Sequence, residues 1–369
     1  MDREHEELRE VVRRYLAEKS DLSGMRKLVQ TGRFRDEAVW SQLARQLMAQ
    51  GIAVPESYGG AGYGPVELSI VLEEMGRSLV VSPYFATVAL AGQLLTASAD
   101  AAARQAWLPG IADGSVTATV AIGDATGEIA ADAVTTVATR APDGWRLTGR
   151  KRFVIDGTTA DLLVVAALAD GEPALFTVEG AAEGVRRAPL PNLDPTRPLA
   201  TVELDGAAAH RLADDAADLL PRFADLAVTA LAAEQAGGAA AALEMAVDYA
   251  RVRVQFDRPI GSFQAIKHRC ADLLLEVESA RNAVHAAASL LAERDPEGSL
   301  AAALAAAWAG RAYTRVAKEN IQIHGGIGFT WEHDAPFYLK RAKTSEMLLG
   351  TTGSHRARLG ALAGIRGAR

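Results

Sequence analysis

Three arginines stand close together between two predicted helices, where they could bind an anionic group. Arg251, Arg253 and Arg258 fall within eight residues, and the helix-breaking segment 259–261 follows them. Guanidinium groups form charge-assisted, bidentate hydrogen bonds to phosphate and carboxylate oxygens. A solvated charged turn has the same composition, so this motif alone leaves an anion site and a plain turn both open.

A second candidate is a double glycine near the C-terminal end of the chain. Gln322 and His324 stand just before the pair Gly325-Gly326. Glycine lets a backbone approach a ligand closely and permits left-handed turns. The same pair also ends ordinary helices, and a histidine there commonly makes a structural hydrogen bond, so this motif too allows a structural interpretation.

The sequence around these motifs changes its periodicity twice. Apolar residues recur at helical spacing over about the first hundred residues and again after Asp214. Between Val116 and about Leu204 they come in short runs separated by turn signals. The pattern predicts an α+β protein that is mainly α-helical, with domains over 1–114, 115–213 and 214–369.

The middle domain is expected to be an antiparallel β domain between two helical ones. Its strands are expected at five short apolar runs: 117–122, 145–147, 162–167, 174–178 and 200–204. Beyond them, an apolar stripe from Phe263 to Leu291 predicts one long helix, and the segment 295–298 separates it from the next.

The composition argues against several classes of protein. Hydrophobic residues make up 49% and charged residues 23%, which is typical of a folded globular chain. The net charge of −7 argues against nucleic-acid binding through a broad basic face. No uncharged apolar run reaches about 18 residues, the charged N-terminus is unlike a signal peptide, and the single Cys270 cannot form an internal disulfide. We therefore expect a cytoplasmic protein with neither a nucleic-acid nor a membrane partner.

Taken together, the motifs and their order resemble the acyl-CoA dehydrogenase family. The stretches that match run along nearly the whole chain: 58–64, 73–77, 143–151, Asp161, 253–256, 259–264, 322–330 and 339–343. The segments 253–264 and 322–330 together make the resemblance specific. It implies a helical N-terminal domain, a middle β domain and a C-terminal four-helix bundle.

The resemblance also implies a chemistry. In this family a carboxylate removes the α-proton of an acyl-CoA thioester, and a hydride passes from the β-carbon to N5 of FAD, which gives the 2-enoyl-CoA. The base must lie close to a thioester whose oxygen is polarised by hydrogen bonds, and the protein orients the flavin. FAD would lie between the β domain and the bundle and reach into a neighbouring subunit of a dimer of dimers. An electron-transfer protein is the implied acceptor.

Six residues match positions that contact the cofactor in the family: Arg253, Phe256, Gln322, Gly325, Gly326 and Thr351. By position, the arginine would bind the FAD diphosphate, with the phenylalanine as its aromatic neighbour. The glutamine and the glycine pair would line the dinucleotide across the dimer interface. A diphosphate needs positive charge and accessible amide groups, and these residue types supply both.

The positions of the catalytic base depart from the family pattern. Leu349 stands where many members carry the glutamate, and Ala227 stands where a subset carries it on the first helix of the bundle. Glu234, seven residues after Ala227 and two turns along the same face, is the best remaining candidate base. Burial in its apolar stretch is expected to raise its pKa towards neutrality. A structural carboxylate paired with an arginine is the alternative, and Glu346 is a weaker candidate base.

The segments that touch the flavin ring in the family are altered as well. Gly123 and Ile155 replace residues with hydroxyl groups, whereas Phe153 keeps an aromatic ring that can stack. Each lost hydrogen bond weakens binding by about 0.5–1.5 kcal/mol. The departures spare the C-terminal segments, and this pattern resembles subunits of heterotetrameric members, including actinobacterial enzymes that act on steroid side chains.

Three functions therefore remain open. The first is an FAD-dependent acyl-CoA dehydrogenase subunit with its own base, acting on a bulky acyl group. The second is a catalytically silent partner subunit that completes the FAD site of a heteromeric enzyme. The third is a flavin oxidase or monooxygenase on the same scaffold. The substitution Glu234→Gln discriminates the first two, because it abolishes turnover only where Glu234 is the base.

Overall fold

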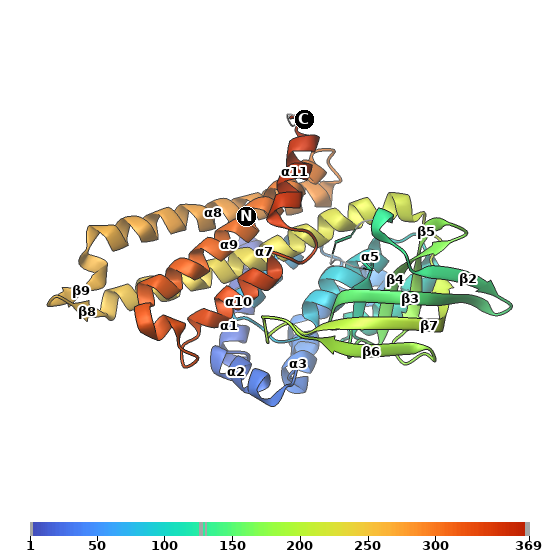
Figure 1. Cartoon of the computed structure of the whole chain (residues 1–369), viewed down its shortest axis with the longest axis horizontal. Helices are drawn as coiled ribbons and strands as arrows, with labels where there is room; N and C mark the ends of the chain where they lie inside the picture. The colour runs from blue at the N-terminus through green and yellow to red at the C-terminus, as the bar shows by residue number, and fades with distance from the viewer. Residues whose placement is uncertain (1–2, 125–127, 130, 366–369) are drawn as a thin grey trace.

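The computed structural model describes residues 3–124, 128, 129 and 131–365. Figure 1 shows an elongated molecule in which a β-sheet lies at one end and long helices run from it to the other end. The blue helices near the start of the chain lie mostly below these long helices in this view, and the later N-terminal helices, in cyan, lie next to the sheet. The predicted mainly α-helical α+β fold is confirmed.

The N-terminal helices begin at acidic caps. Asp21, Asp36 and Asp100 each accept a backbone N–H bond at the start of a helix, which pairs a donor that the helix end would otherwise leave free. The elements of this region are α1 (Arg3–Lys19), α2 (Leu22–Thr31), α3 (Glu37–Leu47), η1 (Ala49–Gly51), η2 (Glu56–Tyr58), α4 (Pro65–Arg77), the π-helical η3 (Phe85–Gly92), α5 (Gln93–Ala97) and α6 (Ala101–Ala112).

A seven-stranded sheet, counted over the described residues, follows these helices. Its strands are β1 (Ala118–Ala121), β2 (Val137–Ala141), β3 (Gly144–Ile155), β4 (Leu162–Ala169), β5 (Glu172–Glu179), β6 (Val185–Leu190) and β7 (Leu199–Arg211), with the short η4 (Ala131–Ala133) before β2. The order is β1-β4-β2-β3-β7-β5, and β6 pairs with β7. Most neighbours are antiparallel, as expected, but β4 pairs in parallel with both β1 and β2.

Five of these strands contain the apolar runs identified in the sequence: β1, β3, β4, β5 and β7. The sequence pattern does not predict β2 and β6, because each of these strands carries arginine and is largely exposed. In β6, the exposed Arg186 reaches Glu203 and Asp205 on β7. An edge strand of this kind is stabilised by its pairing more than by a buried face.

The C-terminal region is helical apart from one short hairpin. Its elements are α7 (Ala216–Val252), the hairpin β8 (Val254–Gln255) and β9 (Arg258–Pro259), η5 (Ile260–Ser262), α8 (Gln264–Glu293), α9 (Gly298–His324), η6 (Gly325–Phe329), α10 (Ala335–Ser345) and α11 (Thr352–Leu362). Among the described helices, α7 alone is long and apolar enough to cross a membrane, but 89% of its most apolar window is buried inside the molecule. A buried core helix has this composition.

Helix α4 crosses α7 with the two backbones in contact. A Cβ placed on Gly76 of α4 would lie 2.0 Å from the carbonyl oxygen of Glu234 on α7. No real Cβ approaches an oxygen so closely, so only glycine allows this crossing. The crossing therefore fixes the position of Glu234 relative to the N-terminal helices.

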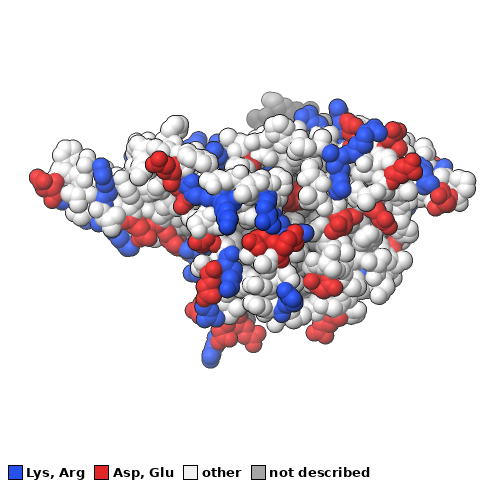
Figure 2. Space-filling model, turned by 90° about the horizontal axis from the view of Figure 1, so that it is seen from below, with Lys and Arg blue, Asp and Glu red and all other residues white. Residues whose placement is uncertain are grey.

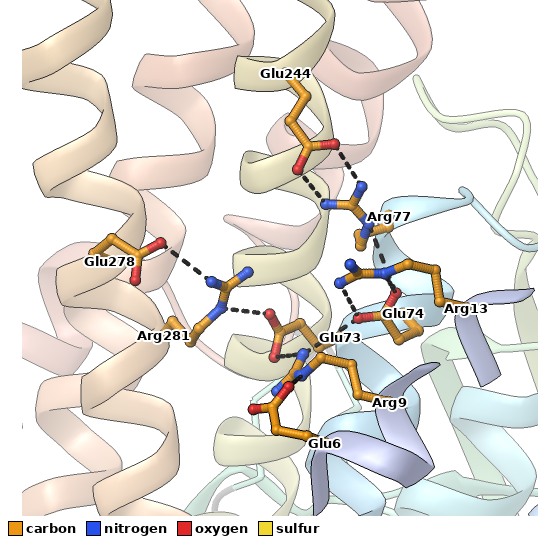
Figure 3. Close-up of polar contacts among 9 residues, drawn as sticks. All are labelled: Glu6, Arg9, Arg13, Glu73, Glu74, Arg77, Glu244, Glu278 and Arg281. Carbon is orange, nitrogen blue, oxygen red and sulfur yellow. Dashed lines mark hydrogen bonds and ion pairs between the residues drawn. The ribbon is translucent and has the colours of Figure 1, made fainter. Parts of the chain in front are cut away.

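A network of ion pairs surrounds the same crossing (Figure 3). Two glutamates of α4 are buried, and arginines from neighbouring helices compensate them. Glu73 pairs with Arg9 of α1 and Arg281 of α8, each at 2.7 Å. Glu74 binds Arg13 of α1 through two bonds of 2.8 and 2.9 Å. Because a buried carboxylate is stable only when paired, the network joins α1 to the C-terminal helices.

Charges of both signs are interspersed over the face seen from below (Figure 2). Acidic and basic side chains there lie next to one another and do not separate into one broad basic area.

Candidate functional site

The arginine-rich junction and the double-glycine turn lie side by side in the folded chain. The ring of Tyr249, in the last turn of α7, stacks on the ring of His324 at the end of α9, with centroids 4.2 Å apart. The Arg253 amide donates a 2.8 Å hydrogen bond to the Tyr249 carbonyl, and Gly325 directly follows His324. Figure 1 shows the hairpin β8–β9, which directly follows α7, at the end of the molecule far from the sheet.

The side chains of these two segments are unusually exposed. Phe256 is 85% and Phe329 is 83% accessible. Arg253 and Gln322 are exposed as well. Large aromatic rings that face solvent in this way are typical of a surface that contacts another molecule. The five predicted cofactor residues of these two segments are therefore all exposed.

The backbone of the double glycine is also open. Gly325 has a φ of +63°, a value that favours glycine, and nothing lies within 4 Å of the position that a Cβ would take on either Gly325 or Gly326. A ligand can approach the main chain closely here. Arg253 and accessible glycine backbone on one surface form a combination that suits a diphosphate.

Thr351, the sixth predicted cofactor residue, lies elsewhere. Its hydroxyl accepts a 3.1 Å hydrogen bond from the Ser354 amide and caps α11. Figure 1 shows α11 well separated from the hairpin β8–β9. The structure does not bring Thr351 together with Arg253 and the double glycine, and its hydroxyl has a structural use where it stands.

Glu234 is fully enclosed by two arginines. Its carboxylate accepts a 2.8 Å bond from Arg341 and a second, short bond from Arg197. Burial on its own would raise the pKa of Glu234, but the charges of Arg197 and Arg341 outweigh burial and hold the pKa below the usual glutamate value. The expectation of a raised pKa is therefore wrong, because the sequence pattern shows the apolar neighbours of Glu234 and not its distant partners.

These groups belong to a buried cluster that joins the sheet to the C-terminal helices. Arg341 of α10 also binds Asp194, at 2.6 Å, in the loop before β7. Asp156, at the end of β3, is buried beside the two arginines and Glu234. Burial raises the pKa of Asp156 to about 7, although Arg197 and Arg341 oppose the shift. Three carboxyl groups thus face two guanidinium groups, and a proton on Asp156 balances the charge.

The residues matched to the flavin ring and to the catalytic base line one small cavity of about 30 Å³, together with their neighbours: Gly123, Phe153, Ile155, Leu348 and Leu349. Phe153 and Leu349 both have a φ of +57°, a conformation that is uncommon for large side chains. Leu349 lines the cavity with an apolar side chain where the family carries a carboxylate. Since one water needs about 10–15 Å³, this cavity by itself holds about two waters.

A larger cavity of about 380 Å³ adjoins the first, since Glu128, Ile129 and Leu349 line both. It lies between the first half of α7 and the start of α11, where His355 and Arg358 line it. Burial and the neighbouring Arg358 lower the pKa of His355, against a hydrogen bond with Gly350. No sequence motif indicates His355 or Arg358, which lie shortly after Gly350 on the first turns of α11.

The weaker candidate base has partners as well. Glu346 accepts bonds from Lys343 at 2.5 Å and from Thr314 at 3.3 Å. Ala227, the other family position for the base, is fully buried in the core. Leu349 and Ala227 carry no carboxylate, and the carboxylates of Glu234 and Glu346 are both paired within the described part of the chain.

Comparison with known proteins shows that the chain belongs to the acyl-CoA dehydrogenase family. The family model described as "Acyl-CoA dehydrogenase, N-terminal domain" matches residues 2–115, and "Acyl-CoA dehydrogenase, C-terminal domain" matches residues 225–363. The resemblance inferred from the motifs is confirmed. The chain is an oxidoreductase of a flavoprotein family that acts on acyl-CoA.

Individual relatives are similar to this chain along almost its whole length. The chain is 35% identical over 354 residues to acyl-CoA dehydrogenase IpdE2 of Mycolicibacterium smegmatis, with 95% of this chain and 96% of the relative covered. It is similar to the solved structure of a Tcur3481-Tcur3483 steroid ACAD G363A variant, with a TM-score of 0.88, 32% identity and 98% of both chains covered. It is also similar to the ChsE4-ChsE5 complex from Mycobacterium tuberculosis, with a TM-score of 0.90, 30% identity and 100% and 99% coverage.

Proposed function

We propose that this chain is the catalytically silent subunit of a heteromeric acyl-CoA dehydrogenase. It presents Arg253 and the double glycine to an FAD molecule whose flavin ring is held by a different, catalytic subunit. The single observation that carries the proposal is Leu349, an apolar side chain at the base position of a cavity of about 30 Å³. A self-sufficient enzyme needs a carboxylate at this position and room for the flavin ring beside it.

The two halves of the expected FAD site fit the cofactor unequally. The surface around Arg253 fits a diphosphate, because its cation and its glycine backbone are open to solvent. The cavity beside Phe153 and Leu349 is by itself too small for a flavin ring, and it has leucine where the family carries the base. A chain that contributes to FAD only across a subunit interface accounts for both findings.

The relatives support a mixed assembly and a large substrate. The names of the two solved relatives pair different chains, and one of them is called a steroid ACAD. We infer from this likeness that the catalytic partner desaturates a bulky, steroid-derived acyl-CoA in a dimer of dimers. Electrons leave the reduced flavin for an electron-transfer protein, as in the family, and a cytoplasmic location stays a prediction.

The decisive experiment is to purify the assembly through a tag on this chain from its native host. We expect two different chains in equal amounts with one FAD per pair, measured by native mass spectrometry and flavin absorbance. The chain expressed alone is expected to be colourless. A yellow tetramer of this chain alone, with one FAD per chain, would overturn the proposal.

Substitutions on the surface around Arg253 test whether it contacts FAD. Arg253→Ala is expected to strip FAD from the assembly, because it removes a charge that faces the diphosphate. Arg186→Ala is the matched control, since Arg186 is 63% exposed and pairs with Glu203 and Asp205 on the sheet. Equal FAD retention in both variants would show that this surface does not bind the cofactor.

One observation favours a second function, an acyl-CoA dehydrogenase with its own base. Glu128 is a carboxylate that lines both cavities beside Leu349. In that case Glu128→Gln abolishes turnover while FAD stays bound, because a carboxylate that takes the α-proton is lost. A silent subunit predicts that Glu128→Gln leaves turnover per FAD unchanged.

A further inference from the structure

Three aromatic rings stack where the two FAD-facing segments meet. His324 lies between Tyr249, 4.2 Å away with the rings 27° from parallel, and His333, 4.3 Å away and tilted by 53°. The three residues come from the last turn of α7, the last residue of α9 and the loop before α10. His324 is 4% accessible, so the middle ring of the stack is shielded from water.

Hydrogen bonds fix both histidine rings. The Nδ1–H of His324 donates to the Asn320 carbonyl at 2.8 Å. The Nδ1 of His333 accepts a 3.1 Å bond from the Ala335 amide, at the start of α10. These contacts set opposite tautomers for the two rings. Neither ring can turn without breaking a bond to the backbone.

The stack adjoins each segment that faces the cofactor. Tyr249 is one turn before Arg253, and its carbonyl accepts the amide of that arginine. Gly325 is the residue after His324. The η6 turn also packs on this histidine, because a Cβ on Gly328 would lie 2.6 Å from the His324 Cβ. Any shift between Tyr249 and His324 therefore changes the separation of Arg253 from the double glycine.

We propose that Tyr249, His324 and His333 are positioning residues that hold Arg253 and the double glycine at the spacing needed to grip the FAD diphosphate. The inference rests on the proposed function, because it assigns a role to residues behind that binding surface. The three rings touch no cofactor atom themselves. They act through the backbone of the two segments that they join.

The stack depends on uncharged histidines. Burial lowers the pKa of His324, as does the neighbouring His333, whereas the bond to Asn320 opposes this. Burial also lowers the pKa of His333, against the attraction of Asp334 and with the help of Arg26, which itself pairs with Asp334 at 2.6 Å. Because both pKa values lie below the ordinary histidine value, both rings are neutral at pH 7.5. Acidification places positive charge on rings whose centroids are 4.3 Å apart, and the repulsion drives them away from each other.

The test uses the tagged assembly and measures the dissociation constant of FAD at pH 7.5. Tyr249→Leu is expected to weaken FAD binding about tenfold, the size of effect that aromatic pair energies produce. Tyr249→Phe keeps the ring and is expected to bind FAD like the wild type. Equal binding by the leucine and phenylalanine variants would overturn the inference.

The pH dependence of FAD affinity distinguishes a positioning role from a merely structural one. FAD affinity of the wild type is expected to stay level around neutral pH and to fall on acidification, at a pH lower than the ordinary histidine pKa, because both pKa values are lowered. His333→Asn keeps an acceptor for the Ala335 amide but cannot become charged, so its profile is expected to be flatter. His268→Asn, at an exposed position of α8, is the control and should follow the wild type. If the FAD affinity of His333→Asn falls with pH as steeply as that of the wild type, the inference is wrong. This test holds even if Tyr249→Leu fails to fold.

Failure of the inference and failure of the proposed function give different results. If Arg253→Ala strips FAD while Tyr249→Leu and His333→Asn bind it normally, the proposed function stands and the stack has no positioning role. If Arg253→Ala also keeps its FAD, the proposed function itself is wrong.

Discussion

A Cβ placed on Gly237 of α7 would lie 1.7 Å from the carbonyl oxygen of Glu73 on α4. The two helices therefore touch backbone to backbone, at the point where Glu73 receives its two arginines (Figure 3). This crossing places the buried carboxylates of α4 and α7 and connects the N-terminal helices to the rest of the fold.

Gly237→Ala is expected to destabilise the protein severely, by about 3 kcal/mol or more, because overpacking at a backbone contact has no flexible neighbour to yield. Urea unfolding measures the change. Gly360→Ala in α11 is the matched control, since nothing lies within 4 Å of its Cβ position. A Gly237→Ala variant as stable as the control would show that the helices do not cross so closely.

Glu234→Gln is expected to lower the free energy of unfolding by about 3–5 kcal/mol, because it leaves Arg197 and Arg341 buried without their shared carboxylate. Turnover per bound FAD in the assembly should stay at the wild-type level. Thermal unfolding and steady-state kinetics on the same preparation separate the two effects. A variant with native stability and no turnover would restore Glu234 as the catalytic base.

Asp156→Asn is expected to change how stability depends on pH. The folded protein holds a proton on Asp156 up to about pH 7, whereas the usual aspartate pKa is 3.8. The folded state thus binds the proton more tightly, and the free energy of unfolding falls as pH rises from about 4 to 7. Asparagine does not titrate, so the variant does not lose this stability. Between pH 4 and pH 8, its free energy of unfolding should rise relative to that of the wild type by up to about 4 kcal/mol. Urea unfolding at both pH values measures it, and parallel profiles for the two proteins would contradict the prediction.

Phe256→Ser is expected to leave the isolated chain as stable as before, within about 0.5 kcal/mol, because the ring is 85% exposed. Association with the partner subunit should weaken, since the ring faces the proposed interface. Co-purification yield and thermal unfolding check the two statements. Leu193→Ser, at another exposed apolar position with 56% accessibility, should affect neither quantity.

The sequence predicts those parts of the fold whose signals are local. Strands β4 and β5 are continuous apolar runs, so they are found directly, whereas β2 and β6 carry arginine and take their conformation from pairing with neighbours. The parallel pairing of β4 with β1 is a long-range property. Alternation along one strand does not reveal it.

The same distinction applies to the site. Arg253 and the double glycine were predicted from short motifs, and the structure places them side by side. The environment of Glu234 was predicted wrongly, because its arginine partners lie 37 and 107 residues away in sequence. The small cavity behind Leu349 depends on segments of the β region and the C-terminal region at once, so no local pattern indicates its volume.

The bare rings of Phe256 and Phe329 carry a consequence for the cell that makes this protein. A subunit with two uncovered aromatic side chains at one end is adhesive towards its own kind and towards other proteins. If the chain has the partner subunit proposed above, synthesis in excess over that partner leaves these rings uncovered and favours aggregation and proteolysis, so we expect the two chains to be produced in matched amounts.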